Sequence, residues 1–162
     1  SVALNHLEDR IRVHTMDLKD APDRLGHSAF DAVLCNPPYG KRGGALRNPR
    51  DELAIARHEI ATDLAAVVRS AAALLRNGGR FFLIHQADRL PEIARRLHEA
   101  GAPLKRVRLV HTSLERRAHL VLCEAVRFAG EGCIVLPPLL LQDAQGQPSQ
   151  ELLRIYQGER TV

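Results

Sequence analysis

Residues 30–44 read FDAVLCNPPYGKRGG and combine three kinds of local structure. The segment of residues 32–35 is short and apolar throughout, which is typical of a central parallel strand covered on both faces. Two adjacent prolines follow, and because proline fixes φ and has no amide hydrogen, neither a strand nor a helix continues through them. A glycine-rich, cationic loop comes next. The sequence therefore predicts a stiff element at the carboxyl end of a strand, which is where open α/β sheets bind ligands.

The tetrapeptide Asn36-Pro37-Pro38-Tyr39 carries the groups needed to hold a planar NH2 group. The prolines supply no competing donor, so the carbonyls of Asn36 and Pro37 and the Asn36 side-chain oxygen are acceptors in fixed directions. Tyr39 adds a ring for stacking. Acceptors that take both amine hydrogens aim the lone pair at an electrophile and stabilise the positive charge that develops on nitrogen. The alternative interpretation is a rigid turn with a surface tyrosine.

Hydrophobic periodicity predicts alternating helices and strands on both sides of this segment. In chain order we expect the last turns of a helix (1–7), a strand (11–15), a polar turn with a short helix (16–25), the strand 32–35, a long helix capped at Asn48 and ended by residues 77–79, a strand (81–85), a helix (91–100), two strands (107–110 and 120–125) and a short helix (149–156). The connection between the last two strands is too short for a crossover helix, so they should form an antiparallel hairpin. The order predicts an α/β domain whose parallel strands are closed by that hairpin.

Composition places the chain among ordinary globular proteins. Of its 162 residues, 45% are hydrophobic and 26% charged, and no apolar run approaches the roughly 20 residues of a membrane span. Cys35, Cys123 and Cys133 lack metal-ligand spacing, so we expect reduced thiols in a cytoplasmic protein without a metal. The net charge of +4 is compatible with a polyanionic partner but is weak evidence by itself. The sequence does not indicate an oligomeric state.

Asn-Pro-Pro-Tyr at the end of a strand resembles the signature of the class I S-adenosylmethionine-dependent amino-methyltransferases. These include adenine-N6 enzymes of DNA and RNA and the release-factor glutamine-N5 enzymes. The resemblance implies a Rossmann-like sheet and S-adenosyl-L-methionine as cofactor. It implies that Asn36 and the Pro37 carbonyl hold the target amine, that Pro38 completes the catalytic motif, and that Tyr39 stacks on the target.

The same resemblance suggests a cofactor contact upstream. Asp17 follows the expected strand 11–15, where such enzymes carry an acidic residue near the cofactor adenine. Its carboxylate would accept a hydrogen bond from the adenine amine, with the Leu18 backbone close by and Asn36 beside the cofactor. Taken alone, an aspartate in a polar turn is more often a solvated surface group.

The loop after the motif is the predicted nucleic-acid contact. Residues 40–50 contain Lys41, Arg42, Arg47 and Arg50 and no acidic residue. A flexible cationic loop beside a target pocket is suited to contact RNA phosphates, and a solvated loop is the alternative. Further arginines that would extend this patch are Arg106, Arg108, Arg116 and Arg117.

Three longer stretches resemble the bacterial tRNA (valine) adenine-N6 methyltransferase family. They are ARHEI (56–60), GGRFFLIHQADRLPEI (78–93) and LPPLLLQDAQGQPSQELLRIY (136–156). The resemblance implies methyl transfer to the N6 amine of adenine in tRNA, with residues 134–162 as a family-specific C-terminal tail. We assign no role to Arg57, His58 and Glu59, and we expect His85 to be a core histidine. The alternatives are a protein glutamine-N5 methyltransferase and a non-catalytic RNA-binding remnant.

The sequence also departs from this family. Its first strand with the glycine-rich cofactor loop, and its second strand, do not appear, since neither Gly43-Gly44 nor Gly78-Gly79 forms G-x-G-x-x-G. We therefore expect residues 1–162 to be the C-terminal part of a single methyltransferase domain, truncated at the N-terminus. Strand 11–15 should then lack a partner, strand 32–35 should have an exposed edge, and the chain alone should bind S-adenosylmethionine weakly or not at all.

Overall fold

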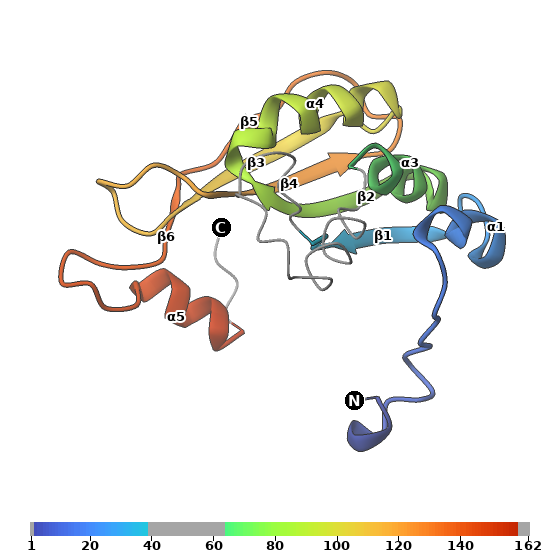
Figure 1. Cartoon of the computed structure of the whole chain (residues 1–162), viewed down its shortest axis with the longest axis horizontal. Coiled ribbons are helices and arrows are strands. Elements are labelled where there is room, and N and C mark those ends of the chain that lie inside the picture. Colours follow the sequence, from blue (N-terminus) through green and yellow to red (C-terminus); the bar gives the residue numbers. More distant parts are fainter. Residues whose placement is uncertain (1, 39–63, 159–162) are drawn as a thin grey trace, which may run out of the picture.

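The computed structural model describes residues 2–38 and 64–158. Its strands form one sheet in the order β1-β2-β4-β3-β5, with β6 also paired to β3 (Figure 1). The strands are β1 (Phe30–Cys35), β2 (Leu75–Gln86), β3 (Leu104–His111), β4 (Leu120–Val126), β5 (Ile134–Val135) and β6 (Leu139–Leu140). The helices are α1 (Ala21–Leu25), α3 (Leu64–Leu74), α4 (Leu90–Glu99) and α5 (Gln150–Tyr156), with 3-10 turns η1 (Ala3–Asn5), η2 (Leu18–Asp20) and η3 (Ala87–Arg89).

The sheet combines parallel and antiparallel pairs. β1 pairs in parallel with β2, and β4 lies antiparallel between β2 and β3. The predicted β3–β4 hairpin is therefore confirmed, as is the α/β sheet of parallel strands closed by it. The short strands β5 and β6 pair in parallel with β3. They were not expected from the sequence.

Helices α3 and α4 pack on the same face of the sheet. Successive side chains of a strand point to opposite faces, and in β2 Phe81 and Leu83 are buried beneath these helices. Ile93 and Leu97 of α4 are fully buried in the same cluster. On the other face Phe82 is 36% exposed. The core of the described residues thus lies on one side of the sheet.

The described part of the long helix is buried at all its positions except Arg69 and Ala73. Its expected cap, Asn48, lies outside the described residues. The helix ends at Leu74, earlier than predicted, because residues 77–79 form an irregularity within β2 instead of a helix stop. A Cβ on Gly79 would lie 2.8 Å from the Arg76 carbonyl oxygen and 3.1 Å from that of Phe30, so glycine is required where β1 approaches.

Two predictions near the N-terminus are wrong. Residues 11–15 form no strand, and Ile11 and Val13 are 44% and 77% exposed. In the described part of the chain no strand lies beside them, and without a partner an extended segment gains no ladder hydrogen bonds. Before them η1 is a 3-10 turn that ends at His6 with φ 52°, not the end of an α-helix.

β1 is an edge strand, so its prediction as a central strand covered on both faces is also wrong. Among the described residues its one partner is β2, and Leu34 is 77% exposed. The expectation of an exposed edge on this strand is confirmed. The physical reason is that a strand is covered on both faces only when flanking strands bring their own helices.

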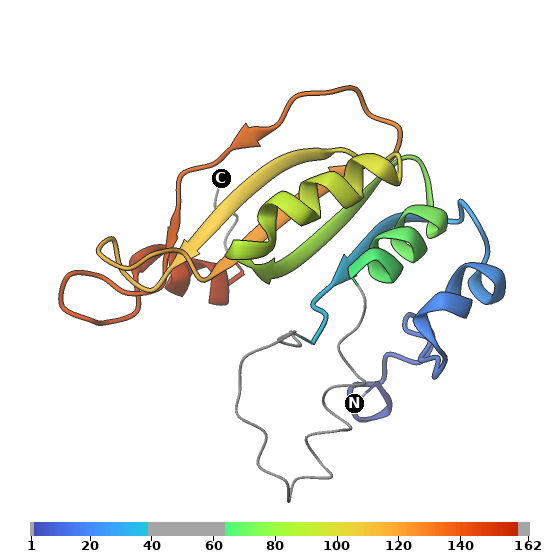
Figure 2. The same ribbon diagram turned by 45° about the horizontal axis from the view of Figure 1, so that its top comes forward.

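The C-terminal segment runs along β3. Figure 2 shows residues after β4 passing beside β3 and ending in α5, shown in red. Ser149 caps α5 by accepting the Leu152 N–H, which confirms the predicted helix. Arg108 of β3 donates to both carboxylate oxygens of Glu151, at 2.7 and 2.8 Å, and to the Pro137 carbonyl at 2.9 Å. The segment is therefore tied to the sheet at several points.

Candidate functional site

The proline pair lies at the carboxyl end of β1. Cys35, the last residue of the strand, pairs with Leu83 of β2. Asn36 and Pro38 are exposed, whereas Pro37 is buried. One proline ring is thus packed into the protein while the flanking residues face solvent, which is the position predicted for a stiff set of acceptors. Tyr39 lies outside the described residues.

Asp17 begins the turn that leads into η2. Its Oδ1 accepts the Lys19 N–H at 2.9 Å, which is a local capping bond, and the residue is exposed. This bond uses only one of the two carboxylate oxygens. Leu18, the next residue, is half-buried and packs against the core, so the turn is held in place next to the sheet.

The predicted cationic loop is not part of the described structure. Lys41, Arg42, Arg47 and Arg50 lie outside the described residues, as do Arg57, His58 and Glu59.

The four arginines considered as an extension of that loop divide into two pairs. Arg106 lies 3.8 Å from Glu124, which also pairs with Arg80, and Arg108 lies 2.7 Å from Glu151, so both have a carboxylate partner within the protein. Arg116 and Arg117 instead lie exposed in the β3–β4 connection.

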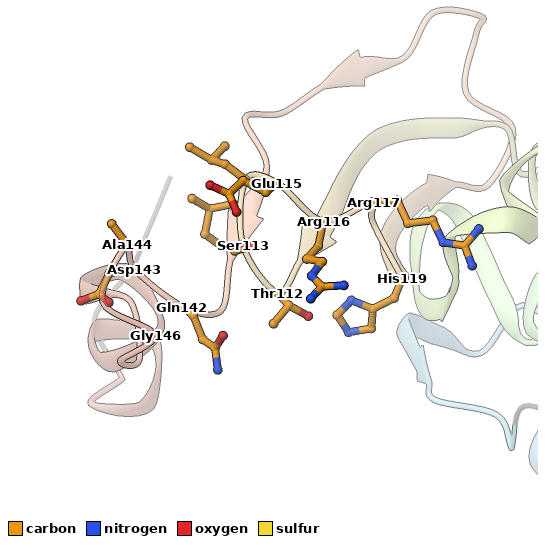
Figure 3. A pocket seen from close by; sticks show the side chains of 12 residues that line it. Thr112, Ser113, Glu115, Arg116, Arg117, His119, Gln142, Asp143, Ala144 and Gly146 are labelled. Carbon is orange, nitrogen blue, oxygen red and sulfur yellow. The ribbon is translucent and has the colours of Figure 1, made fainter.

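A hollow of about 810 Å³ lies between this connection and the turn that follows β6. Figure 3 shows the side chains that line it. The lining residues are Thr112, Ser113, Leu114, Glu115, Arg116, Arg117, His119, Leu140, Gln142, Asp143, Ala144 and Gly146. The two segments are joined by backbone bonds of 2.9 Å from Leu141 N–H to His111 O and from Gln142 N–H to Thr112 O. The sequence did not indicate this hollow, because a two-residue strand such as β6 carries no periodic signal.

The titratable core groups fit structural roles. His85 is 5% exposed, as expected for a core histidine. Burial and the nearby Arg89 lower its pKa. Burial raises the pKa of the Cys123 thiol to about 12, and all three cysteines are free thiols, as predicted.

Two features are absent from the described residues. No cluster of three or more His, Cys, Asp or Glu side chains there is arranged to hold a metal ion. The helices of that part of the chain are also too short or too polar to cross a membrane.

No family model matches the sequence. In fold, the chain aligns over 98% of its length with 70% of a predicted O-methyltransferase from Agrobacterium tumefaciens, with a TM-score of 0.71 and 19% identity. A second solved structure is described as a DNA modification methylase from Thermus thermophilus in complex with S-adenosyl-L-methionine. It aligns with 86% of this chain and 57% of the methylase chain, with a TM-score of 0.51 and 17% identity. The fold is that of the class I S-adenosylmethionine-dependent methyltransferases.

Within that class, a sequence relative confirms the resemblance seen in the three longer stretches. Over 135 residues the chain is 30% identical to tRNA1(Val) (adenine(37)-N6)-methyltransferase of Phocaeicola vulgatus. The match covers 83% of this chain and 55% of the relative. The chain therefore spans about half the length of the curated protein that it matches.

Proposed function

We propose that this chain is part of an S-adenosylmethionine-dependent methyltransferase that modifies the N6 amine of adenine in RNA, and specifically in tRNA. The observation that carries the proposal is the position of Asn36-Pro37-Pro38 at the carboxyl end of β1 in a class I methyltransferase fold. The sequence relative supports adenine in tRNA as the target. A cytoplasmic location would follow from that substrate.

The proposed chemistry requires acceptors and no catalytic base. The Asn36 side-chain oxygen and the Pro37 carbonyl accept the two hydrogens of the adenine amine, and Tyr39 stacks on the base. The lone pair on N6 is then directed out of the ring plane. S-adenosylmethionine, when bound, supplies a methyl group on a sulfonium. The acceptors stabilise the positive charge on N6 until the amine releases its extra proton.

The residues present fit the adenine part of this cofactor. Asp17 is exposed, and its capping bond to Lys19 occupies only Oδ1, so Oδ2 is the atom proposed to accept from the adenine amine. The Leu18 backbone lies in the same turn, which its side chain anchors to the core. Asn36 would lie between cofactor and target.

We also propose that residues 1–162 are the C-terminal part of a larger methyltransferase domain, with 134–162 as its tail. Two observations support this: the chain spans 55% of the curated relative, and β1 has one partner among the described strands. The cationic residues proposed to contact RNA phosphates beside the target are Lys41, Arg42, Arg47 and Arg50.

The test is methyl transfer by the full-length protein to unmodified tRNA, with N6-methyladenosine measured by mass spectrometry after digestion. Asn36→Ala should lower the rate by about 100-fold or more, because one preorganised transition-state contact is lost. Asn77→Ala is the matched control, since Asn77 is exposed at the other end of β2, and it should retain the wild-type rate. Methylation of a release-factor glutamine, or of duplex DNA but not tRNA, would contradict the proposal. So would tRNA binding without any methyl transfer.

A further inference from the structure

We propose that the β3–β4 connection is a second RNA-binding surface, in which Arg116 and Arg117 contact the phosphate backbone of the same substrate. This surface, called here the hairpin surface, consists of Arg116, Arg117 and His119 with Thr112 and Gln142 beside them. The inference rests on the proposed function, because it concerns how the RNA substrate is held. It adds a contact outside the cationic loop 40–50.

The register of the sheet places the hairpin surface at the same end as Asn36. β1 and β2 are parallel, so their carboxyl ends lie at the same edge of the sheet; Cys35, the last residue of β1, is opposite Leu83, and β2 continues to Gln86. Gln86 at the end of β2 pairs with Leu120 at the start of β4. The β3–β4 connection therefore emerges at the carboxyl end of the sheet, beside the end of β2.

A backbone hydrogen bond joins the end of β2 to the β3–β4 connection. The Ala87 N–H, one residue after β2, donates to the His119 carbonyl at 3.1 Å. Neighbouring strands lie about 4.8 Å apart, so Cys123 of β4, which is opposite Leu83, is about 10 Å across the sheet from Cys35 at the end of β1. Leu120, where β4 begins, lies three residues from Cys123 toward the same end of the sheet. An RNA strand leaving the proposed target pocket at Asn36 reaches the hairpin surface without leaving this end of the molecule.

Arg116 and Arg117 keep their charge available to a ligand. Both are exposed, and no ion pair in residues 2–38 and 64–158 includes either of them. Many arginines of the same region pair with carboxylates. These are Arg76, Arg80, Arg89, Arg95, Arg96, Arg106 and Arg108. Adjacent cations left without a protein carboxylate are suited to neutralise phosphates.

The two acidic residues that line the hollow, Glu115 and Asp143, lie away from Arg116 and His119. Asp143 Oδ1 accepts the N–H groups of Gln145 and Gln147, both at 2.9 Å, so it stabilises its own turn. Figure 3 shows the Glu115 side chain on the opposite side of the loop from Arg116 and His119. The side that carries Arg116, His119 and Thr112 is therefore polar and cationic.

The loop that presents these arginines is held by its own backbone. The Arg116 N–H donates to Ser113 O at 3.1 Å, and the His111 ring donates from Nδ1 to Arg116 O at 2.7 Å. The His119 N–H donates to Val110 O at 3.1 Å. A loop fixed in this way loses less conformational freedom on binding. Hydroxyl and amide groups beside the cations add donors for phosphate and sugar oxygens.

The test measures tRNA binding by the full-length protein between about 50 and 200 mM salt. Arg116→Gln with Arg117→Gln should raise Kd about tenfold or more and reduce the slope of log K against log salt by about 1.4, which is 0.7 for each of two phosphate contacts. The control is Arg24→Gln with Arg69→Gln. Arg24 lies in α1 beside the opposite end of β1 (Figure 1), and Arg69 is exposed on α3. The control should bind like the wild type.

Methyl transfer distinguishes this inference from the proposed function. At saturating tRNA the double variant should keep kcat and show a raised KM, since the hairpin surface does not touch the reacting atoms. Adenine methylation by a double variant with wild-type Kd and salt slope would overturn the hairpin surface and leave the proposed function standing. If the wild-type protein binds tRNA but does not methylate adenine, the proposed function is contradicted. If the wild-type protein does not bind RNA, both the proposed function and the hairpin surface are overturned.

Discussion

His85 is a buried imidazole that makes folding stability depend on pH. Burial, and to a smaller extent Arg89, lower its pKa below the ordinary 6.5, so the folded protein favours the neutral ring. The unfolded chain takes up the proton at the ordinary pKa. The contribution of His85 to stability is thus complete above about pH 6.5 and is lost as pH falls toward the folded pKa.

We therefore expect the melting temperature to fall between about pH 7 and pH 5, and to fall less steeply in His85→Gln. Differential scanning fluorimetry over this range measures both slopes. His98→Gln changes an exposed histidine on α4 and serves as control, with the wild-type slope expected. Equal slopes in the wild type and His85→Gln would show that the buried ring does not govern the acid response.

For single residues, the sequence predicted the properties that follow from the residue itself and its neighbours in the chain. The proline pair ends β1 as expected because Pro37 and Pro38 lack amide hydrogens. His85 was predicted as a core residue because it lies on a buried strand. The exposed charge of Arg116 and Arg117 was not distinguishable from that of Arg106 and Arg108, since pairing depends on carboxylates distant in the sequence.

Among the elements, α5 depends on a contact with the sheet. Arg108 and Glu151 have side chains only 12% and 34% exposed, and their bidentate bond joins β3 to the first turn of α5. A seven-residue helix is too short to be stable in water by itself. The ion pair and the Ser149 cap therefore hold it in place.

Glu151→Gln should increase hydrogen exchange in residues 150–156 while leaving the global melting temperature nearly unchanged. The weakened charge-assisted bonds correspond to about 1.5–3 kcal/mol of local stability. Exchange measured by mass spectrometry on peptides from α5 and from β4 separates the local from the global effect. Glu99→Gln removes a partner of the more exposed Arg95 and should leave exchange in α5 unchanged. Equal protection of α5 in the wild type and Glu151→Gln would remove the ion pair from this role.

Elements with strong local patterns were predicted well, and those that need a distant partner were not. Helix α4 and the β3–β4 hairpin follow from apolar spacing and a short connection. Residues 11–15 have strand-like alternation, but a strand forms only beside another strand. β5 and β6 carry almost no pattern and exist because β3 offers a free edge.

For the whole molecule, the helices on one face leave apolar side chains on the other. Leu34 and Phe82 pair across β1 and β2 and are 77% and 36% exposed. The residues proposed to hold the cofactor in this chain are limited to Asp17, Leu18 and Asn36. They form an incomplete site, since no glycine-rich G-x-G-x-x-G segment is present in the sequence.

Residues 1–162 alone should therefore show no thermal shift at micromolar S-adenosylmethionine. A longer version that also includes the proposed N-terminal part of the domain should show one, because ligand binding to the folded state raises the melting temperature. Circular dichroism of both samples checks that each is folded. Micromolar binding by the 162 residues would contradict the incomplete cofactor site.

The location of the candidate site was predictable, whereas its extent was not. The motif at Asn36 and the rule that ligands bind at carboxyl strand ends gave the position. The hollow beside Arg116 requires β6 to bring the turn near Asp143 next to the β3–β4 connection. Such an arrangement depends on long-range pairing, which single-sequence patterns do not report.

The outer side of β1 has a practical consequence for anyone preparing this chain. Its outer N–H and C=O groups, which pair with no other described strand, and the exposed Leu34 side chain beside them form a template on which a strand from another molecule can add. Concentrated samples of residues 1–162 should thus oligomerise through β1. A peptide that occupies this strand, or the substitution Leu34→Lys, should keep the preparation monodisperse.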